Sequence, residues 1–509
     1  MRDKIEHRVP GDAGQINIIE KKGTNFLLYP DWGGDFSGEK LALKTYLSTF
    51  QPEDDVCLLI WLPPEDRVST HEAVSRLAKS IKGLGFDPDW TPDVLLVDSV
   101  GLTQRDQLLD EVQAVVETRS TSGHITLSEA RAKGLPVIST HSDFLAALTH
   151  RTLELSAVVR AAPQVMELAI PGHSKYPQRN QLLAEFIHGY AHFLETKETP
   201  QSAYVAMREW FCLSDGKFND LMKELYAEVY PPQPLPSATG ILGDMRGAQL
   251  AEVSEALRND GFYVFPNRLD AEICDRLLDF ALRTEAILHS APPGIRERQV
   301  YAPNSPLVAK YRIPSESLLD QEDIQRLMAD PSIFAVVQDY LGCVPVLDLL
   351  TMWWSTAVWK DADSEAAQLF HFDMDRTNFL KVFVYLTDVS EETGPHCYVR
   401  GSHQGLPPAL RRDGRFSDQM IAQYYAAEDV VQIAAPRGTI FVADTRGIHK
   451  GVHLQSGHRL IFQMEFASSL FGAPYEEVGS AGRLTPELSH AMQRYPRTFG
   501  LFHRPKATT

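Results

Sequence analysis

The chain has 509 residues, of which 44% are hydrophobic and 23% are charged, and its formal net charge is −18. A chain of this length forms roughly two or three domains, each with its own core. The negative charge disfavours nucleic acids and anionic membranes as partners, because both require a basic surface. No apolar run is long enough to span a membrane, and the polar start Met1-Arg-Asp-Lys-Ile does not predict a secretory signal.

Five cysteines are scattered along the chain, at positions 57, 212, 274, 343 and 397. Their number is odd and no Cys-x-x-Cys pair occurs, so we expect neither a disulfide framework nor a zinc site. Free thiols in a reducing compartment predict a cytoplasmic protein. Nothing in the sequence indicates an oligomeric state.

Short β-rich runs alternate with helical patterns from about residue 16 to residue 162. The runs are nearly continuous in apolar residues, which is typical of strands buried on both faces of a parallel sheet. The alternation predicts a doubly wound, Rossmann-like α/β domain over residues 1–162, without a Gly-x-Gly-x-x-Gly fingerprint. The expected strands begin near residues 16, 26, 56, 94, 114 and 136, and the expected helices include 71–84 and 127–133.

One part of this half resembles the nucleotide-sugar half of a GT-B glycosyltransferase. The resemblance is carried by residues 104–140, above all by His124-Ile-Thr-Leu-Ser-Glu-Ala-Arg-Ala-Lys-Gly-Leu-Pro-Val-Ile-Ser-Thr. Glu129 matches the second glutamate of that family's paired-glutamate motif, but Thr121 stands at the first position and lacks its carboxylate. The half is also too short to include an acceptor domain. We therefore expect a non-catalytic binding or docking module.

Helical patterns fill residues 163–230, a helical extension that either packs on the sheet or bridges the two halves. Residues 231–245, which begin Pro231-Pro-Gln-Pro-Leu-Pro, form the clearest linker in the chain, because dense proline precludes a helix. Residues 246–509 form the C-terminal domain. In it we expect helices at 250–260, 270–285 and 331–341, followed by strands near 352, 379–386, 397, 438–442 and 460–466. This order predicts a closed or two-sheet β-barrel with helices on one side.

His371 and Asp373 lie two residues apart in the run Gln368-Leu-Phe-His-Phe-Asp. Alternate side chains of a strand leave the same face, so this spacing directs an imidazole and a carboxylate to one place. Non-haem Fe(II) prefers two imidazoles and one carboxylate on one face of its octahedron. The pair therefore predicts two of three iron ligands. A second triplet, His141-Ser-Asp143, lacks later partners and is interpreted as a strand end and helix N-cap.

Three histidines could supply the third ligand: His449, His453 and His458. Arg459 favours the first of them. A five-carbon 2-oxo acid held at iron by its keto end places its far carboxylate deeper in the barrel, where a guanidinium pairs with both oxygens. Neighbouring antiparallel strands put a ligand and such an arginine about ten residues apart, the spacing of His449. His453 is too close in sequence, and His458 would face away from its neighbour.

Residues 248–472 resemble the phytanoyl-CoA dioxygenase family of Fe(II)/2-oxoglutarate oxygenases. The motifs that carry the resemblance are Gln368–Asp373, the run Phe379-Leu-Lys-Val-Phe-Val-Tyr-Leu, the run Gly394-Pro-His-Cys-Tyr-Val-Arg-Gly-Ser-His, and Pro436–His449 with Arg459. The resemblance implies a double-stranded β-helix fold of the jelly-roll or cupin type with flanking helices. It also implies that His371, Asp373 and His449 bind iron and that Arg459 binds the C5 carboxylate of 2-oxoglutarate, with O2 as oxidant.

Some relatives carry a hydroxyl two residues after the distal histidine, where this chain has Gly451. A second anchor for the cosubstrate must then come from elsewhere, and Lys381 and Tyr385 are candidates. If their face of the strand lines the barrel, the lysine needs an anionic partner; if it points outward, the lysine is solvated. Gln368 could orient a ligand or the cosubstrate, although a loop role is equally open.

Other polar residues near these motifs are expected to be structural. His396 and His403 lie in Gly-Pro-His and Gly-Ser-His turns, and Asp444 precedes a turn. Asn378 and Arg376 flank the metal strand and either orient ligands or belong to a loop.

The expected enzyme is a hydroxylase that acts on a small-molecule or a sugar- or glycan-linked substrate and releases succinate and CO2. Asp373 fills the position that an iron halogenase of this fold leaves vacant for chloride, which favours hydroxylation. Two alternatives remain open: a non-catalytic binding or scaffold protein, and a glycosyltransferase with an accessory β-helix domain.

Overall fold

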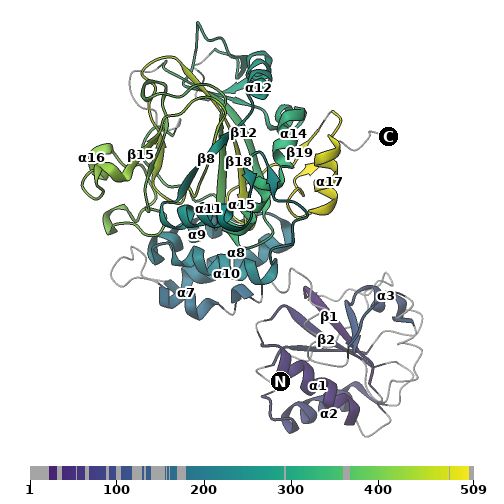
Figure 1. Cartoon of the computed structure of the whole chain (residues 1–509). Helices are drawn as coiled ribbons and strands as arrows, with labels where there is room; N and C mark the ends of the chain where they lie inside the picture. The colour runs from purple at the N-terminus through teal and green to yellow at the C-terminus, as the bar shows by residue number, and fades with distance from the viewer. Residues whose placement is uncertain are drawn as a thin grey trace. The chain divides into compact units, whose positions relative to one another are not determined.

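The computed structural model divides into two compact units, Met1–Ala161 and Ala162–Thr509. Each unit is described below by itself (Figure 1). The residues that the structure describes are 22–30, 32, 37–52, 54–62, 68–87, 91–98, 105–116, 129–130, 133, 135–138, 155, 157–159, 161–168, 179–289, 291, 294–358, 367–480 and 482–503. None of the helices among these residues is both long and apolar enough to cross a membrane.

The first unit is built on a parallel five-stranded sheet with the order β3-β2-β1-β4-β5. This order also occurs in doubly wound α/β folds. Its strands are β1 (Thr24–Leu28), β2 (Val56–Trp61), β3 (Asp93–Val97), β4 (Ala114–Val116) and β5 (Val137–Ile138), and its helices include α1 (Ser37–Thr49), α2 (Thr70–Gly83) and α3 (Arg105–Asp110).

The apolar runs of this unit become strands because both faces of the sheet are covered. Phe26 and Leu28 of β1 belong to one apolar core, while Leu27 belongs to a second core with Leu108 of α3. The strands expected near residues 26, 56, 94, 114 and 136 are present, as is the helix expected over 71–84. The strand expected near residue 16 lies outside the described residues, as does most of the helix expected over 127–133.

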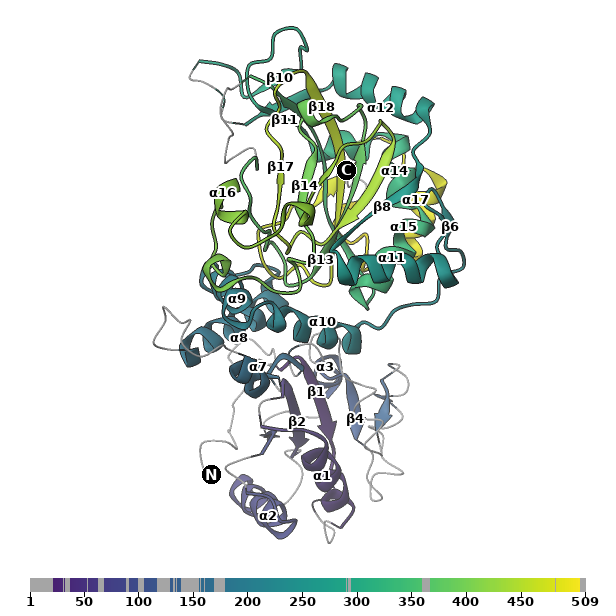
Figure 2. The same cartoon turned by 60° about the vertical axis from the view of Figure 1, so that its left-hand side comes forward.

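The helices of residues 163–230 belong to the second unit, where they gather at one end of the β structure (Figure 2). They are α7 (Ala162–Leu168), α8 (Arg179–Thr196), α9 (Gln201–Ser214) and α10 (Lys217–Val229). The ring centroids of Phe186 and Phe471 lie 5.4 Å apart, and the side-chain amide of Asn219 donates to the carbonyl of Thr377 at 2.5 Å. The helical extension therefore packs on the β structure of its own unit.

The second unit contains two antiparallel sheets. The larger has the order β10-β9-β11-β12-β18-β13-β16-β8 and the smaller the order β15-β14-β17. Their strands are β8 (Phe262–Arg268), β9 (Glu285–Leu288), β10 (Arg298–Val300), β11 (Lys310–Ile313), β12 (Val346–Thr356), β13 (Phe379–Tyr385), β14 (His396–Val399), β15 (Val430–Ile433), β16 (Thr439–Ala443), β17 (His449–Gly451) and β18 (His458–Ala467).

The two sheets face each other across an apolar core. Phe383 and Phe441 from the larger sheet share this core with Tyr398 and Ile433 from the smaller one. Short pairs, β6 (Thr239–Gly240) with β7 (Gly243–Asp244) and β19 (Val478–Gly479) with β20 (Phe502–His503), complete the unit. The flanking helices are α11 (Gly247–Asn259), α12 (Ala271–Arg283), α13 (Ser315–Leu319), α14 (Glu322–Met328), α15 (Pro331–Leu341), α16 (Asp418–Ile421) and α17 (Pro486–Arg494). This is the two-sheet arrangement, with helices beside it, that the sequence predicts.

Candidate active site

The backbone brings His371 and His449 together. Each residue's N–H donates to the other's carbonyl, at 3.0 and 2.8 Å, and the N–H of Asp373 donates to the carbonyl of Thr445 at 2.7 Å. His371, Asp373 and His449 each offer one ligand atom, and these atoms all lie within 4.8 Å of one another. Two residues of one segment and one residue at the start of β17 thus form a single group, as the sequence predicts.

Hydrogen bonds select the imidazole tautomers. Nδ1 of His371 lies 2.8 Å from the carbonyl of Leu369, and Nδ1 of His449 lies 3.0 Å from the carbonyl of Gly447. A carbonyl only accepts, so each Nδ1 carries the proton and each Nε2 keeps a lone pair. The two Nε2 atoms lie 3.4 and 3.3 Å from the carboxylate oxygens of Asp373.

Electrostatics keeps this group in the protonation state that binds a metal. Burial and the neighbouring His449 lower the pKa of His371, which favours its neutral form. Burial alone raises the pKa of Asp373, but Lys381 and the two histidines hold it well below its usual range. A neutral imidazole at His371 and an ionised carboxylate at Asp373 are ligand forms that a non-haem Fe(II) site uses.

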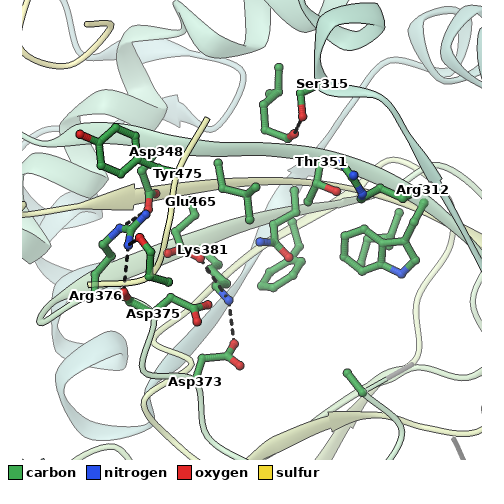
Figure 3. Close-up of a pocket in the computed structure, with 18 of the residues that line it drawn as sticks. Arg312, Ser315, Asp348, Thr351, Asp373, Asp375, Arg376, Lys381, Glu465 and Tyr475 are labelled. Atoms are coloured by element: carbon green, nitrogen blue, oxygen red, sulfur yellow. Dashed lines mark hydrogen bonds and ion pairs between the residues drawn. The ribbon is translucent and has the colours of Figure 1, made fainter. Parts of the chain in front are cut away.

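Lys381 lies between two buried carboxylates. Its ammonium is 2.7 Å from Oδ2 of Asp373 and 3.1 Å from Oε2 of Glu465, its register partner on β18 (Figure 3). Burial lowers the pKa of Lys381, but the two acids outweigh it and raise that pKa. Burial raises the pKa of Glu465 to about 8, and Lys381 opposes the rise. This face of β13 therefore lines the cavity, and its lysine is engaged by acids rather than free to anchor the cosubstrate.

Arg459 is buried without a carboxylate partner. Its side chain is 5% exposed; one nitrogen donates to Oγ of Ser355 at 3.2 Å, another donates to the carbonyl of Gly394, and Nε has no partner. Among the described residues no acid lies within ion-pair distance of it, and burial lowers its pKa. A Cβ added at Gly451 would lie 3.4 Å from Nη2, so the residue without a side chain leaves space beside the guanidinium. An unpaired buried guanidinium is a strong site for a carboxylate.

Lys310 lies in the same row of the large sheet as Arg459, although it was not among the site residues predicted from the sequence. In the register of the large sheet Lys310 pairs with Ser355, and Ser355 pairs with Arg459. Burial lowers the pKa of Lys310 to about 8, and the charges of Arg312, Arg459 and Lys381 add to the shift. Lys310 makes no ion pair with the acids that the structure describes. Lys310 and Arg459 therefore lie in one row with Ser355 between them, and neither forms an ion pair with the described acids.

A single cavity of about 450 Å³ contains all of these groups. Lys310, Arg312 and Arg459 line one part of it, with Trp353 beside them. Acids that line the cavity and were not predicted as site residues are Asp348, Asp375, Glu465 and Glu476.

Neither Tyr385 nor Gln368 lines the cavity, and for Gln368 the sequence had left a loop role equally open. The hydroxyl of Tyr385 donates to the carbonyl of Ile433 at 3.0 Å and accepts from the N–H of His396 at 2.9 Å. Its hydrogen bonds are thus made with the backbone, and it does not line the cavity. Gln368 also does not line the cavity; its side-chain oxygen lies 2.9 Å from Nδ1 of His453. The same-face rule places Tyr385 correctly on the strand but cannot show that its hydroxyl reaches another sheet.

His396 is closer to the site than its turn motif suggests. It lines the cavity, and its ring centroid lies 5.4 Å from that of His449. Asp444 instead fixes a loop, as expected, because it binds Arg446 at 2.7 Å and the hydroxyl of Tyr340 at 2.5 Å. His403 bonds to the carbonyl of Arg258 and is also structural.

Residues 257–459 match the family model described as Phytanoyl-CoA dioxygenase (PhyH). Comparison with curated proteins gives no match. Among solved structures, the chain is similar to the epimerase SnoN in complex with Fe3+, alpha ketoglutarate and nogalamycin RO, with 20% identity over 43% of this chain and 84% of that chain and a TM-score of 0.32. It is similar to HygX from Streptomyces hygroscopicus with nickel and 2-oxoglutarate bound, with 18% identity, coverage of 43% and 88%, and a TM-score of 0.32. It is also similar to EctD from S. alaskensis with bound Fe, with 16% identity over 47% of this chain and 83% of that chain and a TM-score of 0.31.

The family match spans the segment that holds the buried His-Asp-His group, and it ends at Arg459. The donor set of that group fits Fe(II), and the unpaired cations beside it fit the carboxylate of 2-oxoglutarate. Residues 257–459 of the second unit form a phytanoyl-CoA dioxygenase (PhyH) domain, which is a domain of a non-haem iron, 2-oxoglutarate-dependent oxygenase.

Proposed function

We propose that His371, Asp373 and His449 bind Fe(II) and that the enzyme hydroxylates a small-molecule substrate. The observation that carries this proposal is the convergence of three buried ligand atoms within 4.8 Å, in the same cavity as an arginine without an acidic partner. When bound, Fe(II) supplies the activation of O2 and the oxidative decarboxylation of 2-oxoglutarate. The overall reaction converts substrate, O2 and 2-oxoglutarate into hydroxylated substrate, succinate and CO2.

Arg459 and Lys310 hold the far carboxylate of 2-oxoglutarate. Their register across β11, β12 and β18 places two cations and the hydroxyl of Ser355 in one row. A guanidinium fork gives two parallel hydrogen bonds to a carboxylate, and the lysine adds a second charge. Lys310 thus replaces Lys381 and Tyr385 as the second anchor.

Lys381 is a positioning residue for the metal carboxylate. By donating to Oδ2 of Asp373 at 2.7 Å, it occupies one oxygen and leaves Oδ1 to the metal. Glu465 in turn holds the lysine at 3.1 Å. A metal ion held by His371, Asp373 and His449 would have further positions available for the cosubstrate and O2.

The experiment is an anaerobic titration of purified protein with Fe(II) and 2-oxoglutarate, followed by a turnover assay. We expect a weak visible charge-transfer band and O2-dependent succinate release, both absent in His371→Ala. His458→Ala is the matched control, since its ring packs against Tyr301 and Trp354 instead of the metal group. A wild-type protein that shows neither band nor succinate is a binding or scaffold protein rather than an enzyme.

The first unit keeps the role that the sequence predicts for it, a non-catalytic, Rossmann-like binding module. Its parallel sheet supports this fold class, and Glu129, the residue that carries the glycosyltransferase resemblance, lies among the described residues. Thr121, where the first carboxylate of the motif is expected, lies outside them. A sugar- or glycan-linked substrate and a cytoplasmic location also remain predictions of the sequence.

A further inference from the structure

The part of the cavity away from Arg459 and Lys310 is acidic. Asp348 of β12 accepts from Nε of Arg376 at 2.7 Å through Oδ2, while its other oxygen, Oδ1, is buried and has no hydrogen-bond partner among the described residues. The side chain of Asp348 is only 2% exposed, and it lines the cavity. A buried carboxylate oxygen without a donor is costly, and a bound ligand can supply the missing donor.

Asp375 is the second free acceptor at this end. It lines the cavity, is half-buried, and its carboxylate makes neither a hydrogen bond nor an ion pair with the residues that the structure describes (Figure 3). Burial raises the pKa of Asp348, Arg376 opposes the rise, and the charge of Asp375 adds to it, so the two acids are close enough to interact.

The two cations at this end, Arg376 and Lys381, already form ion pairs with acids of the second unit. Arg376 is paired with Asp348 at 2.7 Å, and Lys381 is shared by Asp373 and Glu465. Four carboxylates thus face two cations, and Asp375 is the one that forms no ion pair with the described residues. Exposed Glu476 at the cavity wall adds a further negative charge.

The wall at this end is built partly from residues that follow the family match, which stops at residue 459. Ala473, Tyr475 and Glu476 line the cavity. Arg376 ties this segment to the metal loop, because its Nη1 donates to the carbonyl of Ala473 at 2.5 Å and to that of Asp375 at 3.0 Å. This end of the cavity therefore combines Asp348 and Asp375, which lie inside the family match, with wall residues from the segment that follows it.

We propose that this end of the cavity binds a protonated amine of the substrate, with the carboxylate of Asp375 and Oδ1 of Asp348 as its acceptors. An ammonium group supplies several donors together with the missing positive charge. A neutral alcohol supplies the donor but no charge, and an anion is repelled. This assignment rests on the proposed function, because it names the substrate of the same cavity.

The test compares three probes of one shape: cyclohexylamine, cyclohexanol and cyclohexanecarboxylate. Their binding is measured by ligand-observed NMR to full-length protein loaded with Ni(II) and 2-oxoglutarate, so no turnover is needed. We expect the amine to bind at least about tenfold tighter than the alcohol, and the carboxylate weakest. In Asp375→Asn the preference for the amine falls to about twofold or less.

Glu477→Gln is the matched control, since it removes one negative charge from an exposed neighbour that does not line the cavity. It should keep the preference for the amine. Equal losses in both variants, equal binding of amine and alcohol, or no binding of the amine would each overturn the proposal. The Fe(II) and 2-oxoglutarate band is recorded on a metal-free portion of the same protein, to which Fe(II) is added instead of Ni(II). Absence of this band overturns the proposed function, whereas a normal band without amine preference overturns only the amine site.

Discussion

The central strands of the two units are buried to a similar extent, but they carry different kinds of side chain. In the first unit, all six residues of β2 (Val56–Trp61) are apolar or cysteine and buried. In the second unit, β18 is also buried along nearly its whole length, yet it carries Arg459, Gln463 and Glu465 on the face that lines the cavity. Burying apolar surface stabilises a fold by about 25 cal/mol per Å², whereas each buried ion costs several kcal/mol unless it is paired. Buried charge therefore distinguishes the central strand that lines the cavity from the central strand that only packs in a core.

The largest expected effect comes from breaking the buried ion network. Lys381→Met leaves Glu465 and Asp373 without their cation, so we expect the free energy of unfolding of the second unit to fall by about 3–5 kcal/mol. Urea denaturation followed by tryptophan fluorescence measures it. Adding Glu465→Gln to this variant should restore part of the loss, because it removes the unpaired acid. A double variant no more stable than the single one would contradict the network.

Arg459→Met tests the cosubstrate end. We expect the Kd of 2-oxoglutarate to rise about 30-fold or more, since removing one partner of a buried charge pair costs about 2–5 kcal/mol. Isothermal titration of metal-loaded, anaerobic protein provides the value. Arg437→Met, which removes an exposed arginine paired with Asp275, is the control and should leave this Kd unchanged.

Lys310 gives a pH dependence of cosubstrate binding. Burial lowers its pKa to about 8, and the charged groups nearest to it are Arg312, Arg459, Lys381 and Asp373. The lysine is cationic below this pH and neutral above it, so 2-oxoglutarate affinity should fall as pH rises through about 8, by at most about tenfold per pH unit. The Lys310→Met variant should bind 2-oxoglutarate weakly at every pH, and its affinity should no longer fall as the pH rises through about 8. An unchanged slope in the variant would assign the titration to another group.

The smallest effect is expected in the first unit. Glu129→Gln should change the Kd of 2-oxoglutarate and the rate of succinate release by less than about twofold, because Glu129 belongs to the first unit and does not line the cavity. The same preparation is assayed for hydrolysis of nucleotide-sugars. Hydrolysis by wild type that is lost in Glu129→Gln would show that the first unit is also a catalytic one.

The metal group could be predicted because its signal is local. His371 and Asp373 lie two residues apart in one short segment that bridges to His449, and His449 and Arg459 lie ten residues apart on the consecutive strands β17 and β18, which belong to the two facing sheets. Lys310 and Asp348 could not be found in this way. Lys310 reaches the site through the pairing of β11, β12 and β18, whose register depends on residues far apart in sequence.

The sequence also could not predict what the helical extension packs against. An amphipathic pattern shows that α8 has an apolar face but not what covers it, and Phe471, which lies against Phe186, is far along the chain. Apolar runs, by contrast, predicted the parallel sheet of the first unit, because a strand covered on both faces needs no partner to be recognised.

Arg376 joins three parts of the second unit through one guanidinium: Asp348 of β12, the carbonyl of Asp375 and the carbonyl of Ala473. A change of substrate preference must therefore alter Arg376 and the segments that it binds together, and not one of them alone. If residues 473–476 were exchanged so that Arg376 no longer bound them, the segment would lose its hydrogen bond to the loop that carries His371 and Asp373. The change in substrate preference would then be accompanied by a displacement of these two residues.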